Sequence, residues 1–246
     1  MFSPQKIALS LPTPEENLAL DDALLQRSEA GLAADEPASQ HEWLRFWESS
    51  HHFVVLGASG KLAEETDGDS CRRDGVAILR RASGGGTVLQ GPGCLNYALV
   101  LSLVDRPNLR DVTRCYEEVL GRVAQAFAPR SVEPCGVSDL TVAGVKFSGN
   151  AQKRARHALL HHGTILYDFD LSRMERYLPM PAQQPPYRRD RPHSSFCTNL
   201  DESRAVIEET IARVWSARDP EAALVTPDLS QLINEKYGNA EWTERF

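Results

Sequence analysis

The sequence lacks the features of a membrane-spanning, secreted or zinc-binding protein. No apolar run approaches the roughly 20 residues of a membrane span, and residues 1–11 have neither the charged region nor the long apolar region of a secretory signal. The five cysteines are an odd number without a C-x-x-C pair, so neither a disulfide framework nor a zinc site is expected. We therefore expect a cytoplasmic protein with reduced thiols, no membrane partner and no metal site of its own.

An excess of positive charge is lacking as well. The formal net charge is −7, which disfavours general nucleic-acid binding. Basic residues gather only locally, at 80–81, 153–156 and 188–191. This pattern fits an anionic small ligand, an acidic protein partner or, for the last two groups, scattered solvated charge.

The chain does contain enough apolar material for one folded domain over residues 1–246. Of the 246 residues, 41% are hydrophobic and 25% are charged. We expect a core over about residues 12–217 and a helical extension over 218–246. Because strands and helices interleave without strict βαβ alternation, the predicted class is α+β, with helices flanking a mixed sheet.

Hydrophobic periodicity locates the individual elements. Helices are expected over 15–28, 111–128, 171–178, 200–215 and 228–237. Strands are expected over 42–47, 53–57, 76–81, 95–103 and 159–167, and on both sides of a turn at Gly144. Residues 30–40 are predicted to form a loop, and the proline-rich stretch 180–192 a mobile surface connection. In the 200–215 helix, the residues expected to face inward are Val206, Ile207, Ile211, Val214 and Trp215.

The strand over 76–81 leads into the stretch RRASGGGTVLQGPG, residues 80–93. Three consecutive glycines permit positive φ and close approach of a ligand to the main chain. Free N–H groups in such a turn form an anion-binding concavity, to which Arg80 and Arg81 add charge. The alternative is a glycine-rich hairpin turn with a surface arginine pair. Neither G-x-x-x-x-G-K-[ST] nor G-x-G-x-x-G is present.

Two later stretches accompany the glycine loop. Residues 139–152 read DLTVAGVKFSGNAQ, and residues 159–166 read LLHHGTIL. With these three motifs in the same order, the chain resembles the superfamily of lipoate–protein ligases and octanoyltransferases, which includes the catalytic domain of biotin–protein ligases. The resemblance covers roughly residues 15–200, and the second and third motifs look lipoate-type rather than biotin-type.

The resemblance implies an enzyme that makes an amide from a carboxylic acid and a protein lysine. Members form an acyl-adenylate from ATP or receive an activated acyl group from a carrier protein. Lys146 is the expected catalytic residue, since one ammonium can contact the phosphate and the acyl carbonyl together. The implied cofactors and substrates are ATP, Mg²⁺ and lipoate or octanoate. The implied partner is a lipoyl-domain acceptor, such as the glycine cleavage H protein or a dehydrogenase E2 subunit.

The resemblance also assigns the remaining site residues. The nucleotide or acyl-adenylate site is expected to comprise Arg81, Ser83, Gly84, Gly85, Gly86, Thr87, Val88, Leu89, Asp139, Lys146, Ser148 and Gly149. The acyl pocket is expected to comprise Trp47, His162, Gly163 and Thr164. Asp139 is predicted to accept from the adenine amino group or to orient Lys146, unless it is a plain turn residue. His161 and His162, adjacent on a strand, should point to opposite faces.

Departures from the family pattern leave alternatives open. Gln90 stands where many members have histidine, and glutamine cannot transfer a proton. About 30 residues follow Trp215, too few for the accessory domain of longer ligases, so a separate subunit is expected if that role is needed. Cysteine-dependent octanoyltransferases use a cysteine ahead of the lysine, and Cys135 is the candidate here. The hypotheses are an ATP-dependent lipoate–protein ligase, a cysteine-dependent transferase and a non-catalytic acyl-binding relative.

Overall fold

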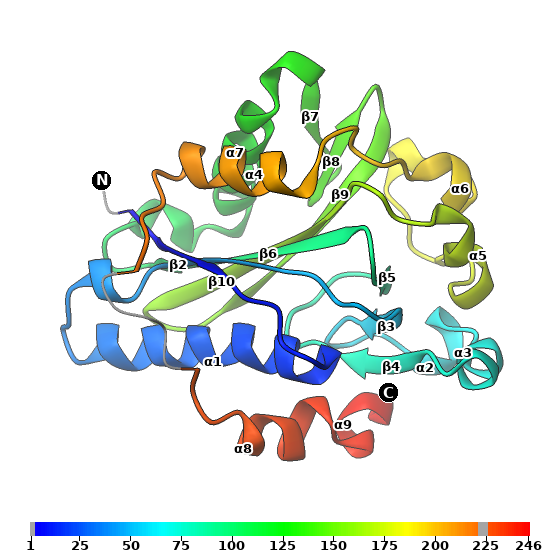
Figure 1. The fold of residues 1–246 in the computed structure, drawn as a ribbon, viewed down its shortest axis with the longest axis horizontal. Coiled ribbons are helices and arrows are strands. Elements are labelled where there is room, and N and C mark those ends of the chain that lie inside the picture. The colour runs from blue at the N-terminus through cyan, green and yellow to red at the C-terminus, as the bar shows by residue number, and fades with distance from the viewer. Residues whose placement is uncertain (1–2, 221–225) are drawn as a thin grey trace.

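Two β-sheets of unequal size form the centre of the molecule (Figure 1). The computed structural model describes residues 3–220 and 226–246. The larger sheet has the order β1-β2-β6-β10-β9-β8-β7 and the smaller one β4-β3-β5. The strands are β1 (Gln5–Ala8), β2 (Trp43–Trp47), β3 (Phe53–Leu56), β4 (Ala77–Arg80), β5 (Val88–Gln90), β6 (Cys94–Ser102), β7 (Val132–Cys135), β8 (Asp139–Val142), β9 (Val145–Arg154) and β10 (Ala158–Leu166). Parallel pairs, β1 with β2 and β3 with β4, occur beside antiparallel ones. The predicted mixed α+β class is confirmed.

Helices cover both faces of the larger sheet. In the view of Figure 1, α4 and α7 lie above it and α1 lies below it. The helices are α1 (Pro14–Ala33), α2 (Leu62–Glu65), α3 (Gly68–Asp74), α4 (Val112–Ala126), α5 (Met174–Tyr177), α6 (His193–Phe196), α7 (Arg204–Val214), α8 (Ser230–Leu232) and α9 (Ala240–Glu244). A π-helical turn, Ile233–Tyr237, follows α8. Asp111 caps α4, as predicted, by accepting from the Arg114 amide.

Strand alternation divides the interior into two cores. All nine residues of β6 are buried, and successive side chains point to opposite faces. Tyr97 and Leu99 pack in the cluster beneath α4 and α7, whereas Ala98 and Val100 pack against α1. A sheet covered on both faces needs apolar residues at consecutive positions, which explains why alternation is weak in this part of the sequence.

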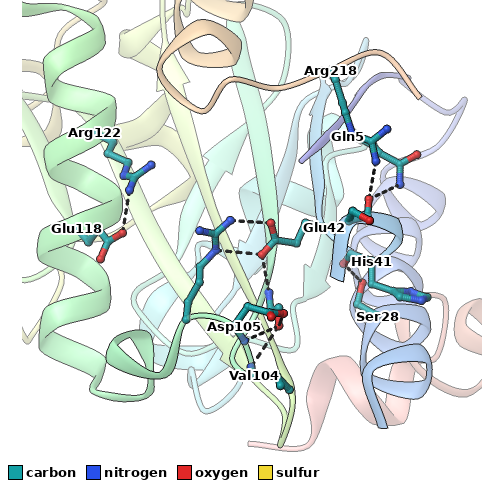
Figure 2. A network of polar contacts seen from close by, with 12 residues as sticks. Gln5, Ser28, His41, Glu42, Val104, Asp105, Glu118, Arg122 and Arg218 are labelled. Carbon is teal, nitrogen blue, oxygen red and sulfur yellow. Dashed lines mark hydrogen bonds and ion pairs between the residues drawn. The ribbon is translucent and has the colours of Figure 1, made fainter. Parts of the chain in front are cut away.

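A buried carboxylate joins β2 to the chain after β6 (Figure 2). Glu42 is fully buried. Its Oε1 accepts from Arg106 Nε at 3.0 Å and from the Ser102 amide at 3.0 Å, and its Oε2 accepts from Arg106 Nη2 at 2.6 Å. A buried charge needs such a partner, so this pair fixes the register at the end of the sheet remote from the small sheet.

Several boundaries differ from the sequence predictions. The first helix begins with a capping box between Thr13 and Glu16 and continues through the buried Gly31 to Ala33, into the stretch 30–40 that was predicted as a loop. The sheet begins at Gln5 instead of within a core starting near residue 12. Val206 is 42% exposed, so its predicted inward orientation is wrong. Residues 180–192 lie at the surface, as predicted, but Arg188 is buried there and Tyr187 and Arg191 bond to Asp139 and Gly144 of the sheet's hairpin.

The C-terminal helical segment contacts both α1 and the strand before the glycine loop. Arg80 is fully buried, and it donates to the carbonyl oxygens of Gly57 at 2.8 Å, Gly60 at 2.6 Å and Thr243 at 2.7 Å. In return, Trp242 Nε1 donates to the Arg80 carbonyl at 2.9 Å. The predicted role of Arg80 as a charged donor for an anion is therefore wrong, since its guanidinium holds the backbone together.

Replacing Arg80 with Met should destabilise the protein strongly. Three buried carbonyl oxygens would lose their donor, and each unsatisfied group costs about 1–3 kcal/mol, so urea denaturation should show a free energy of unfolding lower by at least about 3 kcal/mol. Arg72→Met is the control, because the Arg72 side chain is 75% exposed. Equal effects of the two substitutions would contradict a structural role for Arg80.

Candidate active site

The glycine loop between β4 and β5 is shaped by Arg81. Its Nη2 donates to the carbonyl oxygens of Gly84 at 2.6 Å and Gly86 at 2.9 Å, and its Nε donates to Ser83 Oγ at 3.0 Å. Burial lowers the pKa of Arg81 to about 10. The guanidinium thus donates to the loop itself and, through Nη1, to the Val55 carbonyl oxygen at 3.3 Å. The phosphate-positioning role of Arg81 stays a prediction.

This arrangement turns amide groups outward. In a planar trans peptide the C=O of one residue and the N–H of the next point in opposite directions. Because the carbonyls of Gly84 and Gly86 face Arg81, the amides of Gly85 and Thr87 face away from it. Gly84, Gly85 and Gly86 are exposed. The loop therefore offers N–H donors to a ligand. Val88 and Leu89, predicted as part of it, instead belong to β5 and pair with Val55 and Val54.

The hairpin of β8 and β9 holds the lysine. Lys146 Nζ lies 2.7 Å from Asp139 Oδ1, and Tyr187 donates its hydroxyl to Asp139 Oδ2 at 2.7 Å. Burial and the neighbouring carboxylate raise the pKa of Tyr187, which keeps its hydroxyl protonated as a donor. Of the roles predicted for Asp139, the structure supports orientation of Lys146.

The glycine loop and the side chain of Lys146 lie over the same face of β9. A Cβ added to Gly149 would lie 2.9 Å from Lys146 Nζ, so the absence of a side chain there makes room for the ammonium. A Cβ added to Gly85 would lie 3.9 Å from Ala151 Cβ. Residues 149 and 151 share a face and lie about 7 Å apart along a strand. The ammonium and the exposed glycine amides are thereby neighbours.

Ser148 is buried and accepts a hydrogen bond from Asn150, so it supports the strand.

The two histidines of β10 point to opposite faces, as predicted. His161 is buried beside Tyr97 and Tyr116, on the α4 side. His162 Nε2 lies 2.6 Å from Ser83 Oγ, on the side of the glycine loop. Burial lowers the pKa of each to about 3, and for His162 the charge of Arg81 adds to the effect. Both rings are therefore neutral at pH 7, and His162 can fix the Ser83 hydroxyl.

The predicted acyl-pocket residues are only partly brought together. A small cavity between α1 and the sheet is lined by Leu18, Asp21, Asp22, Arg81, Ala82, Ser83, Leu160, His162 and Tyr237. Trp47 reaches its wall indirectly, by donating to Asp21 Oδ2 at 3.1 Å. Thr164 pairs with Gly149, on the lysine side. Gly163 instead faces Asn150 and Tyr97 on the other face, where a Cβ would collide with Asn150 Oδ1 at 1.8 Å.

Most of the chain matches one known protein family. The model of the lipoyl protein ligase A/B catalytic domain matches residues 13–217. The chain belongs to this family. Every motif residue described above falls inside the matched part of the lipoyl protein ligase A/B catalytic domain.

Relatives of two kinds are similar to the chain. One is the "Probable lipoate-protein ligase A" of Mycoplasma pneumoniae, 28% identical over 94% of this chain, which spans 60% of that protein's length. Another is the "Octanoyltransferase LipM" of Carboxydothermus hydrogenoformans, 29% identical over 94% of both. Ligases and transferases thus both resemble this member of the family.

The fold itself matches a solved structure closely. The bi-partite lipoate protein ligase of Thermoplasma acidophilum, whose structural study includes its E2 lipoyl domain, superposes with a TM-score of 0.81 at 22% identity. The match covers 99% of this chain and 97% of that one. At this identity the likeness establishes the lipoyl protein ligase fold and nothing finer.

Two cysteines lie near the lysine, one of them unexpected. Cys135 ends β7, is half-buried and pairs with Asp139 across the strands. Cys197, which the sequence did not single out, forms a bridge pair with Lys146. It is buried, and burial raises the pKa of its thiol despite the nearby charges of Lys146 and Arg188. A thiolate is therefore disfavoured at Cys197.

The segment after α5 supplies residues beside Lys146 that the sequence analysis did not assign to the site. Tyr187, Arg188 and Arg191 come from the stretch predicted to be mobile, and Phe196 lies in α6. The ring of Phe196 packs against Tyr187 at 5.2 Å and lies beneath Lys146 Nζ at 5.9 Å. The available signal was the density of arginine and aromatic residues in an otherwise proline-rich stretch.

Within residues 3–220 and 226–246, no group of three or more His, Cys, Asp and Glu residues is arranged to hold a metal ion. No helix in that part of the chain is long and apolar enough to cross a membrane. Gln90, at the position where many family members have histidine, is buried, and its Oε1 lacks a hydrogen-bond partner among the same residues.

Two neighbouring glycines should respond differently to substitution with Ala. Gly85 has φ +93°, and an added Cβ would lie 2.9 Å from Arg81 Nη2, whereas Gly86 has no atom within 4 Å of the added Cβ. Gly85→Ala should lower the free energy of unfolding by about 1–2 kcal/mol and weaken the binding of an anion such as pyrophosphate at least tenfold by calorimetry. Gly86→Ala should keep wild-type stability. Unchanged stability and affinity in Gly85→Ala would mean that the loop is only a turn.

Proposed function

We propose that the protein is an ATP-dependent lipoate–protein ligase, which attaches lipoate or octanoate to a lysine of a lipoyl domain. One observation carries the proposal. Lys146, fixed by Asp139 and accommodated by Gly149, lies over the same face of β9 as the outward amides of the glycine loop. An ammonium beside backbone N–H donors suits a ligand that joins a phosphate to a polarised carbonyl.

The proposed reaction has two steps. The lipoate carboxylate attacks the α-phosphorus of ATP, and pyrophosphate leaves as the acyl-adenylate forms. The amine of the acceptor lysine then attacks the acyl carbonyl, the amide bond forms and AMP leaves with the electrons of the broken C–O bond. Lys146 stabilises the charge that develops on phosphate and carbonyl oxygens. The amides of Gly85 and Thr87 position the phosphate. His162 holds Ser83, and Asp139 holds Lys146.

The proposed reaction also determines which partners are expected. The expected acceptor is a lipoyl domain, of a glycine cleavage H protein or a dehydrogenase E2 subunit. For Mg²⁺, the described residues offer no carboxylate cluster of their own. The ion is therefore expected only as the counter-ion of the ATP phosphates, the usual manner of Mg²⁺ binding at nucleotide sites.

The runner-up function is a cysteine-dependent octanoyl or lipoyl transferase. Cys135 favours it, because this half-buried thiol lies opposite Asp139 and therefore beside the lysine. The similarity to LipM along 94% of both chains is consistent with it. Against it, Cys135 lies in the last position of a strand that pairs with β8, which restricts movement toward a substrate.

The third hypothesis, a non-catalytic acyl-binding relative, predicts that Lys146 is dispensable.

Lys146→Ala should reduce acyl transfer by a factor of at least about 100, as loss of a group that stabilises developing charge does. The assay incubates the protein with lipoate, ATP and a lipoyl domain and weighs the domain by mass spectrometry. Lys153→Ala is the matched control, because Lys153 lies on the same strand and is exposed. A folded Lys146→Ala protein with near-normal turnover would refute the proposed function.

Cys135→Ser separates the two enzyme mechanisms. A thioester enzyme requires the thiolate as nucleophile, whereas a ligase does not. We expect the variant to keep activity within about twofold of wild type, with strict ATP dependence and release of pyrophosphate. Cys197→Ser should behave in the same way. An acyl adduct on Cys135 that forms without ATP and disappears in the serine variant would instead establish the transferase.

A further inference from the structure

Three cations surround one aromatic ring beside the proposed active site. Lys146 Nζ lies 5.9 Å from the ring centroid of Phe196, and the guanidinium carbons of Arg188 and Arg191 lie at 4.5 Å and 5.3 Å. We call these three cations and Phe196 the Phe196 cation cluster. The ring attracts each cation only modestly, by about 0.5–1 kcal/mol at exposed sites. Gathering three like charges therefore needs further compensation.

The nearest carboxylate cannot compensate all three. Asp139 is occupied by Lys146 through Oδ1 and by Tyr187 through Oδ2. Arg191 is satisfied differently, since it donates to the carbonyl oxygens of Arg188 at 3.0 Å, Tyr187 at 3.0 Å and Gly144 at 3.2 Å. These carbonyls carry no net charge, so the cluster keeps a positive excess.

Arg188 is the member whose donors are not all used. It is 4% exposed, and its Nε donates to the Arg191 carbonyl at 3.0 Å. Its Nη2 is buried without a hydrogen-bond partner in the part of the chain that the structure describes. Burial lowers the pKa of Arg188, the expected direction for a guanidinium taken out of water. A buried, unsatisfied charged donor is costly, so a partner from outside the chain is expected.

We propose that the Phe196 cation cluster binds a phosphoryl group of the substrate, with Arg188 as a second cationic ligand beside Lys146. The forked donors of a guanidinium match phosphoryl oxygens, and the charge excess matches an anionic group. Binding of a phosphoryl group by the cluster does not depend on the proposed function; only the molecule that carries this group rests on it. The α-phosphate of ATP is one source, and the phosphate of a carrier's phosphopantetheine arm is the other.

Arg188→Met tests this assignment, with Arg189→Met as the control from the same turn. Arg189 is exposed, so its substitution removes an equal charge without touching the cluster. Calorimetry with pyrophosphate, AMP and 4′-phosphopantetheine measures anion affinity. We expect Arg188→Met to weaken binding of pyrophosphate, and of whichever organic phosphate is the substrate, at least tenfold, and Arg189→Met less than twofold.

Stability of the unliganded protein gives a second readout. Replacing an unsatisfied buried charge with an apolar side chain of similar volume is neutral or stabilising. The melting temperature of Arg188→Met should therefore equal or exceed that of wild type. A merely structural arginine would lower it. If the Met variant does not fold, Arg188→Gln, which keeps donors but not charge, is compared in the same way.

The outcomes separate the inference from the proposed function. Wild-type anion affinity in a folded Arg188 variant overturns the inference, as does failure of the wild type to bind any of the three anions. Arg188-dependent binding of 4′-phosphopantetheine, without binding of AMP, supports the cluster and refutes the ATP-dependent ligase. Arg188-dependent binding of AMP supports both.

Discussion

The ion pair between Lys146 and Asp139 is the contact on which the site depends. Its partners come from adjacent strands of one hairpin, and a β-bulge at Leu140 and Thr141 shifts the register between them. Gly149 must lack a side chain for the ammonium to lie where it does, and Tyr187 must occupy the second carboxylate oxygen. One electrostatic contact thus constrains a strand register, a glycine and a distant loop.

The glycine loop illustrates how backbone becomes a binding surface. Arg81 donates hydrogen bonds to the carbonyl oxygens of Gly84 and Gly86. Because each peptide group is planar, the amide that follows each of these carbonyls points away from Arg81. A buried arginine can therefore prepare an anion site without touching the anion. In our proposals the positive charge at the ligand comes instead from Lys146 and Arg188.

Sequence patterns predicted the parts of the molecule whose signals are local. The strands 42–47 and 53–57, the α4 helix and the three motifs depend on periodicity or short spacing, and each lies where expected. The roles of Arg80, Arg188 and Cys197 could not be predicted in this way. Arg80 meets a carbonyl 163 residues away in sequence, and Cys197 meets Lys146 only after the chain has passed around α5 and α6. Such contacts are products of tertiary packing.

The hydrogen bonds that Arg80 donates to backbone carbonyl oxygens have a consequence for which sequences this contact accepts. Arg80 recognises carbonyl oxygens, which every amino acid carries, and not particular side chains. At position 243 the hydrogen bond therefore constrains the path of the backbone and not the identity of the side chain. Gly57 is constrained separately, because an added Cβ would lie 1.9 Å from the Gly85 carbonyl oxygen, so the strand end and the C-terminal segment have unequal freedom to change in sequence.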